Sequence, residues 1–316
     1  MQTPTILEEL IPLRQTNFAD EIAAGLLAKS ASISPKFLYD ALGSHLFTAI
    51  TLLPEYYPTD TEKSILMQFQ NGIAQVVGKN GVLIDLGAGN CQKAESLFQS
   101  IQPSTYVAID FSEDYLHDAI NKLQGKYPHI QMHGLGMDFS SQLAIPDSIP
   151  KTGRTFFYPG SSLGNFLTAE AKTLLTAIKR QITTGGLLMG IDLMKEDSVL
   201  RAAYDDPLQV TAAFNLNILR SINGLLGSNF DVKQFKHQVL INHSESRVEL
   251  YLEALDELTV TWPGNSRVFK KGERIHTENS HKYTLESIKS LLKSAGFEST
   301  QAWTDPKQYF AVIYAQ

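Results

Sequence analysis

The sequence contains one cysteine, Cys91, and no apolar run that approaches the roughly 20 residues needed to cross a bilayer. A single cysteine excludes an internal disulfide and a multi-cysteine metal site, which is typical of a reducing compartment. The opening stretch, MQTPTILEELIP, lacks the basic segment and apolar core of a signal peptide. We therefore expect a cytoplasmic protein that does not enter a membrane.

Positive charge is also scarce. Lys and Arg number 27 against 33 Asp and Glu, so the net charge is −6, and the sequence pI is about 5.8. Proteins that bind nucleic acid usually carry a dense basic stripe, and none is visible here. We therefore expect no nucleic acid among its partners. We also expect a monomer that binds a small molecule. The 316 residues allow one large core or two ordinary ones.

What the sequence does contain is a regular alternation of short apolar runs and helical patterns between residues 80 and 195. Composition predicts strands at 82–86, 105–109, 130–135, 155–158 and 187–193. Residues 94–101 have the spacing of an amphipathic helix, and Ser112 is suited to cap the next one. This alternation predicts an α/β fold, with parallel strands joined by helical crossovers.

The alternation stops near Lys195 and resumes at Thr284. A helical face then ends at Gly296, and strand-like runs around Trp303 and at 309–314 form an antiparallel hairpin. We therefore expect one domain to comprise residues 60–195 and 284–316. An inserted α+β domain takes residues 1–59 and 196–283, because no matching strand is visible before residue 60.

The end of the first predicted strand carries the strongest local motif. Asp85 ends the strand, and Gly87 and Gly89 lie in the following turn, where glycine lets the backbone approach a ligand at a helix N-terminus. The dinucleotide fingerprint requires a third glycine, which is absent, and Asp85 would repel a pyrophosphate. A carboxylate here suits the ammonium of a bound methionine group, which favours S-adenosylmethionine over NAD.

Two further strand ends fit the same cofactor. Asp110 ends the second strand, where a carboxylate can accept hydrogen bonds from both ribose hydroxyls. Asp138 could accept from the adenine amino group, and Phe139 could cover the adenine face. Two of these residues have an ordinary alternative: Asp110 could cap the next helix, and Phe139 could belong to the core. Cys91 is a small packing residue by default, and we assign it no chemistry.

Beyond this turn, five segments resemble the histidine Nα-methyltransferase family of ergothioneine biosynthesis. They are residues 39–44 (YDALGS), 53–59 (LPEYYPT), 160–166 (GSSLGNF), 203–207 (AYDDP) and 277–280 (TENS). The resemblance runs over nearly the whole chain. It implies a Rossmann-like class I methyltransferase domain with a second, substrate-binding domain. It also implies that histidine is converted to its trimethylated betaine by three transfers from S-adenosylmethionine.

The resemblance carries residue roles with it. Asn165 and Tyr204 match the residues that hold the substrate carboxylate and amine, and Tyr39 matches the one near the reacting nitrogen. The positions that match residues recognising the imidazole are Tyr56, Glu278 and Ser280. If residues 275–279 are extended, His276, Glu278 and Ser280 should share one face. The spacing of His276 and His281 does not match a zinc motif, and we expect no metal.

The chain also departs from the family. The turn reads Gly87-Ala88-Gly89 where relatives tend to have small hydroxyl residues, although Lys93 matches. Leu250 replaces a methionine of the mycobacterial-type enzymes and lies on the expected pocket wall. Two alternatives therefore stay open. One is the same chemistry on another amine, such as tryptophan, and the other is a silent relative that binds S-adenosylmethionine or an amino acid without catalysis.

Overall fold

The computed structural model describes residues 5, 6, 18–111 and 113–316, so the predicted cap Ser112 lies outside the described residues. The chain divides into two compact units. Unit 1 contains Pro58–Met194 and Lys282–Gln316 with the start of the chain, and unit 2 contains Arg14–Tyr57 and Lys195–His281. Along the described stretches, no helix is long and apolar enough to cross a membrane.

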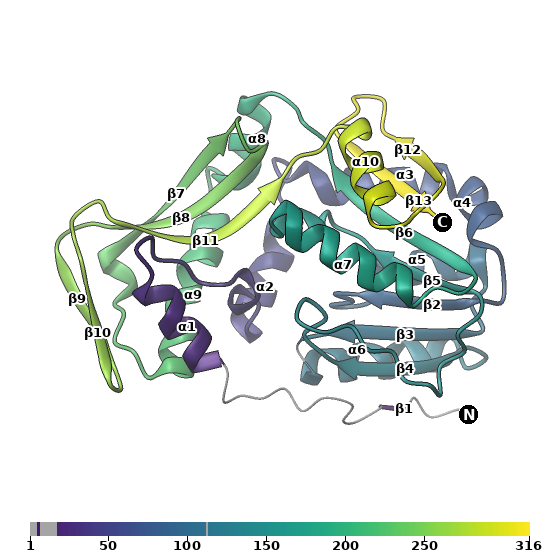
Figure 1. Cartoon of the computed structure of the whole chain (residues 1–316), viewed down its shortest axis with the longest axis horizontal. Helices are drawn as coiled ribbons and strands as arrows, with labels where there is room; N and C mark the ends of the chain where they lie inside the picture. Colours follow the sequence, from purple (N-terminus) through teal and green to yellow (C-terminus); the bar gives the residue numbers. More distant parts are fainter. Residues whose placement is uncertain (1–4, 7–17, 112) are drawn as a thin grey trace. The chain divides into compact units, whose positions relative to one another are not determined.

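Unit 1 is built on a mostly parallel eight-stranded sheet of order β1-β4-β3-β2-β5-β6-β13-β12 (Figure 1). Strands β1 to β6 are parallel, and β13 pairs antiparallel with β6 and with β12. The strands are β1 (Thr5–Ile6), β2 (Val82–Leu86), β3 (Thr105–Asp110), β4 (Gln131–Gly136), β5 (Arg154–Tyr158), β6 (Gly185–Asp192), β12 (Thr300–Thr304) and β13 (Phe310–Ala315). The prediction of a class I methyltransferase sheet closed by a hairpin is confirmed.

Helices cover both faces of this sheet, which explains why its central strands are mostly apolar. Val82, Ile84 and Leu86 pack into one cluster with α7 and α10, whereas Leu83 packs into the other with α3 to α6. The helices around this sheet are α3 (Tyr57–Gln68), α4 (Gln70–Val77), α5 (Gln92–Ile101), α6 (Glu113–Lys126), α7 (Thr168–Arg180) and α10 (Leu285–Ser294). The strand order reverses at β2 and β5, where ligands of such sheets bind at the carboxyl ends.

One expectation about the start of the chain was wrong. No strand was expected before residue 60, yet β1 pairs in parallel with β4 through Thr5↔His133 and Ile6↔Gly134. Two residues at a sheet edge are too few to leave an apolar run in the sequence. The other unit boundaries fall at Pro58, Lys195 and Lys282, against the expected 60, 196 and 284.

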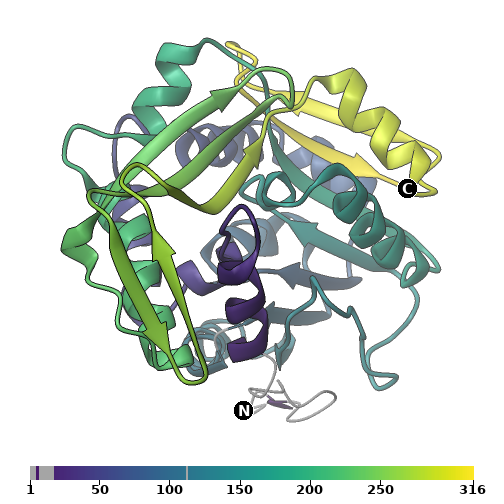
Figure 2. The ribbon, with the colours of Figure 1, turned by 60° about the vertical axis from the view of Figure 1, so that its left-hand side comes forward.

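Unit 2 contains helices packed on a three-stranded antiparallel sheet, β11-β8-β7, and a separate hairpin (Figure 2). Its longest helix, α9, contacts β7 and β8, and Phe214, Ile218 and Ile222 of α9 belong to its apolar core. Its elements are α1 (Phe18–Leu27), η2 (Pro35–Leu38), α2 (Ala41–Ile50), α8 (Asp197–Tyr204), α9 (Val210–Leu226), η4 (Val232–Gln234), β7 (Phe235–Asn242), β8 (Arg247–Ala254), β9 (Leu258–Trp262), β10 (Asn265–Phe269) and β11 (Arg274–His281).

Candidate active site

The turn after β2 is open on the side that a ligand would approach. Gly87 and Gly89 have φ values of 70° and 51°, which favour glycine, and a Cβ at either position would meet nothing within 4 Å. The amide N–H of Gly89 donates to Oδ2 of Asp110 at 2.8 Å. The end of β3 is thereby tied to the turn, and Asp110 remains half-buried. Ala88 lies between the glycines and donates its N–H to Ile109 O at 3.0 Å.

Asp85 lies buried beneath this turn. Its Oδ2 accepts a hydrogen bond from the Tyr106 hydroxyl at 2.8 Å, while its Oδ1 has no hydrogen-bond partner among the described residues. Burial raises the pKa of Asp85 to about 7, against the opposing effect of Tyr106. A cationic donor such as an ammonium group would supply the missing partner. The orphaned oxygen and the open glycine turn therefore fit S-adenosylmethionine.

Lys93, in the first turn of α5, forms an ion pair with Glu62 of α3, and its Nζ lies 2.6 Å from Oε2. The other oxygen, Oε1, accepts the N–H of Gly160 at 2.8 Å. Gly190 of β6 makes room for this carboxylate, because a Cβ there would overlap Oε1. Glu62 was not among the residues singled out from the sequence. The sequence offered one hint, at Gly190, because a glycine inside a strand often marks the close approach of another group. It did not indicate that this group is Glu62.

The residues expected to bind adenine follow β4. Asp138 accepts hydrogen bonds on Oδ1 from the Ser140 amide, at 3.1 Å, and from the Ser140 hydroxyl. Phe139 is half-buried and stands edge-on to Tyr158, with ring centroids 5.8 Å apart. Phe139 packs against the core of unit 1, so its expected alternative role is partly visible, and adenine binding by either residue stays a prediction.

Asn165 ends the short helix η3 (Ser162–Asn165), which follows β5 at the carboxyl edge of the sheet. Gly160 and Ser161 precede it with φ values of 76° and 57°, so the chain turns sharply. The amide of Asp192 donates to Ser161 Oγ at 2.9 Å, which ties this turn to the end of β6. Asn165 itself is half-buried.

In unit 2, four of the predicted substrate residues lie together. Tyr204 and Leu250 belong to one buried cluster against which Tyr56 packs, and the Tyr56 and Tyr204 rings are 6.2 Å apart. The Tyr204 hydroxyl lies 2.7 Å from Ser280 Oγ in a buried hydrogen bond. Tyr39 is joined to them through Phe47, whose ring makes edge contacts with both Tyr39 and Tyr56.

The expected alternation along β11 was wrong at His276. A β-bulge between His276 and Glu278 leaves Thr277 without a partner in the ladder, so the faces change after it. Glu278 then pairs with Leu250 and Ser280 with Val248, which puts Glu278 and Ser280 on the apolar-cluster face. His276 instead lies on the opposite face, where its ring hydrogen-bonds to Asn279 Oδ1 at 2.9 Å.

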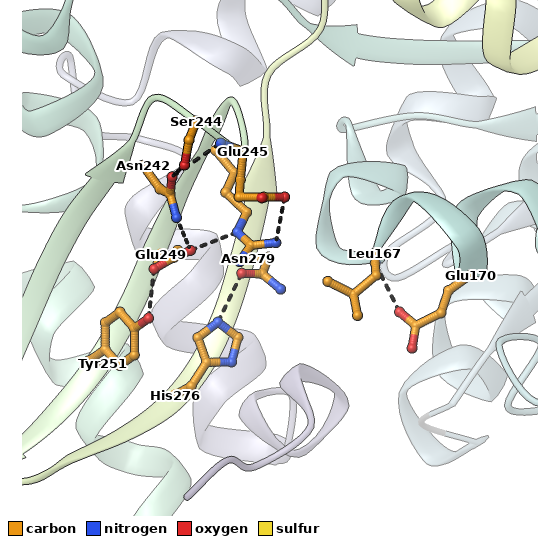
Figure 3. A network of polar contacts seen from close by, with 10 residues as sticks. Leu167, Glu170, Asn242, Ser244, Glu245, Glu249, Tyr251, His276 and Asn279 are labelled. Carbon is orange, nitrogen blue, oxygen red and sulfur yellow. Dashed lines mark hydrogen bonds and ion pairs between the residues drawn. The ribbon is translucent and has the colours of Figure 1, made fainter. Parts of the chain in front are cut away.

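That opposite face carries a polar network (Figure 3). Glu249 accepts from Tyr251 at 2.6 Å, from Arg247 at 2.7 Å and from Asn242 at 2.9 Å. Its pKa is lowered because these donors outweigh its burial. Over the residues with described positions, no group of three His, Cys, Asp or Glu side chains could hold a metal ion.

Comparison with known proteins identifies the family. A family model described as histidine-specific, S-adenosylmethionine-dependent methyltransferase matches residues 18–316. The chain is 35% identical to histidine N-alpha-methyltransferase of Mycolicibacterium smegmatis and 33% identical to that of Mycobacterium tuberculosis, each covering 93% of both chains. It is 26% identical to N-methyltransferase dtpB of Aspergillus flavus, over 98% and 92% of the two chains. The protein therefore belongs to the histidine-specific, S-adenosylmethionine-dependent methyltransferase family.

Proposed function

We propose that this methyltransferase transfers methyl groups from S-adenosylmethionine to the α-amine of free L-histidine, in three steps that give the trimethylated betaine. The observation that carries the proposal is in unit 2. Glu278, a buried carboxylate, shares a strand face with Ser280, and Ser280 hydrogen-bonds to Tyr204 beside Tyr56 and Leu250. An aromatic and aliphatic cluster with one carboxylate and one hydroxyl suits a flat ring that carries an N–H donor.

Within the proposed ring site, Glu278 accepts a hydrogen bond from the imidazole N–H, and Tyr56 and Ser280 complete its recognition. A buried site of this type discriminates strongly, because an analogue without the N–H removes one hydrogen bond from a buried polar site. Leu250, which pairs with Glu278 across the ladder, forms part of the wall.

At the other end of the substrate, Asn165 holds the carboxylate and Tyr204 the amine. Tyr39 orients the nitrogen and accommodates the growing methylammonium, partly by attraction between the cation and its ring. The amine must be neutral to attack, and we assign no side chain as its base, so the proton passes to water. Holding the nitrogen in line with the methyl group can supply on the order of 7 to 11 kcal/mol in the best cases.

S-adenosylmethionine, when bound, supplies a methyl group made electrophilic by the sulfonium. In unit 1, the turn of Gly87, Ala88 and Gly89 lets the backbone approach the cofactor, and Asp85 pairs with its ammonium. Asp110 accepts from the ribose hydroxyls. Asp138 accepts from the adenine amino group, while Phe139 covers the adenine face.

A panel experiment tests this function. Purified protein is incubated with S-adenosylmethionine and single amino acids, and the products are identified by mass spectrometry. Trimethylated histidine as the preferred product supports the proposal, and preference for another amine in competition would overturn the choice of histidine. Leu250 makes tryptophan and secondary-metabolite amino acids the first competitors to include. We further propose that the protein is a cytoplasmic monomer and that it acts without nucleic acid. Size-exclusion chromatography with light scattering tests the oligomeric state.

A further inference from the structure

Glu62 occupies a central position in unit 1 that the proposed chemistry does not use. It comes from α3, yet its carboxylate meets groups that follow β2 and β5 and packs against β6 at Gly190. The side chain is only 2% exposed, and both oxygens are engaged, one by Lys93 and one by the Gly160 amide. A buried charge is costly unless it is paired, so this placement requires both donors.

Lys93 is partly exposed, unlike its partner Glu62. Its side chain is 39% exposed, whereas the carboxylate that it contacts belongs to a side chain that is only 2% exposed. An ammonium has three donors, and Glu62 takes one of them, which leaves others for a ligand. The charges that act most on Asp85 are Asp110, Lys93 and Glu62, so Lys93 is the cation in a group of carboxylates.

The cofactor carries a carboxylate as well as an ammonium and a sulfonium. Three protein carboxylates would repel the cofactor's carboxylate, and Lys93 is placed to offset them. We propose that Glu62 is a positioning residue for cofactor binding, which holds Lys93 toward the carboxylate of S-adenosylmethionine and fixes the Gly160 turn beside it. The inference rests on the proposed use of this cofactor.

The test compares Glu62→Gln, Lys93→Met and the double variant by calorimetric titration with S-adenosylmethionine. Glutamine keeps the shape and can still accept from the Gly160 amide, but it loses the charge that orients Lys93. We expect the Kd of Glu62→Gln to rise about tenfold or more, as for loss of a hydrogen bond between charged groups. The KM for histidine at saturating cofactor should stay within about twofold. The double variant should bind no more weakly than Lys93→Met alone, because Glu62 acts through Lys93.

Glu95→Gln is the matched control. Glu95 lies on the same helix as Lys93 and forms its own ion pair with Lys126 at 3.1 Å, so its loss should leave the Kd unchanged. An unchanged Kd in Glu62→Gln, or additive losses in the double variant, would overturn the inference. Circular dichroism shows whether Glu62→Gln folds. If it does not, the Kd of the double variant compared with that of Lys93→Met still tests the inference. Wild-type protein that binds no S-adenosylmethionine would overturn both proposals, whereas binding without methylation of histidine would count against the proposed function alone.

Discussion

The hydroxyl of Tyr204, at the end of α8, lies 2.7 Å from the hydroxyl of Ser280 on β11, 76 positions further along the chain. The bond is buried and joins a residue proposed to hold the amine to one proposed to recognise the ring. It therefore couples the two ends of the proposed histidine site.

Ser280→Ala tests this coupling. Removal of a buried hydrogen bond typically costs about 1 to 3 kcal/mol. We expect kcat/KM for histidine to fall about tenfold, with no change in the Kd of S-adenosylmethionine. Initial rates over a range of histidine concentrations measure the effect, and an unchanged kcat/KM would count against the proposed pocket. Ser294→Ala is the control, since Ser294 Oγ bonds to Leu291 O within α10 of unit 1.

Glu278→Gln tests the recognition of the ring. The amide keeps the volume but weakens a charge-assisted hydrogen bond, so kcat/KM for histidine should fall about tenfold to a hundredfold. Histidine should also lose its advantage over other amino acids in competition. Glu253→Gln is the matched control, because Glu253 belongs to the same sheet and pairs with Lys236 at 2.9 Å. Retained selectivity in Glu278→Gln would remove this residue from the site.

Asp85 predicts a dependence of stability on pH. Burial raises its pKa from 3.8 to about 7, so between these values the folded chain holds a proton that the unfolded chain has released. The contribution of Asp85 to stability is therefore fully present below pH 4, falls as the pH rises toward 7 and is level above it. Asp85→Asn should abolish this slope and stabilise the protein at pH 8 by on the order of 4 kcal/mol.

Urea unfolding at several pH values measures that slope, and the same variant should bind S-adenosylmethionine more weakly. Asp118→Asn, on an exposed position of α6, is the control and should leave the slope as it is. A parallel pH profile for wild type and Asp85→Asn would show that the pKa of Asp85 is the same in the folded and the unfolded chain.

Lys282 and Asp192 form a buried ion pair in unit 1, with Nζ 2.8 Å from Oδ2 and neither side chain more than 1% exposed. Lys282→Met removes one half of this buried ion pair, so it should lower the free energy of unfolding by about 3 to 5 kcal/mol. The double variant Lys282→Met/Asp192→Leu should recover most of this loss. Urea unfolding checks both, and a single-variant loss below about 1 kcal/mol would contradict the expectation.

The sheet of unit 1 could be predicted because each central strand leaves a pattern among residues that are close together in the sequence. Its central strands are buried on both faces, so each leaves a mostly apolar run such as 82–86, in which Asp85 is the one charged residue, and turn residues separate these runs from helical patterns. The glycine turn and Asp110 could be found for the same reason. The edge strand β1 left no such pattern, because two residues show no periodicity.

The missed parts of the site depend on distant contacts. Glu62 meets Lys93 across 31 positions and Gly160 across 98, and nothing near Glu62 in the sequence indicates either partner. The exchange of faces at His276 depends on a bulge that contains no glycine, so strict alternation was the natural expectation.

That bulge gives β11 a built-in offset of one residue. Deleting Thr277 would make His276 and Glu278 neighbours in a regular strand, and because neighbouring side chains point to opposite faces, both would keep their present sides of the sheet. Pairing Thr277 into the ladder instead, with the rest of β11 shifted by one residue, would turn Glu278 to the face of His276. The unpaired state of this one residue therefore decides which side of the sheet Glu278 presents to a substrate.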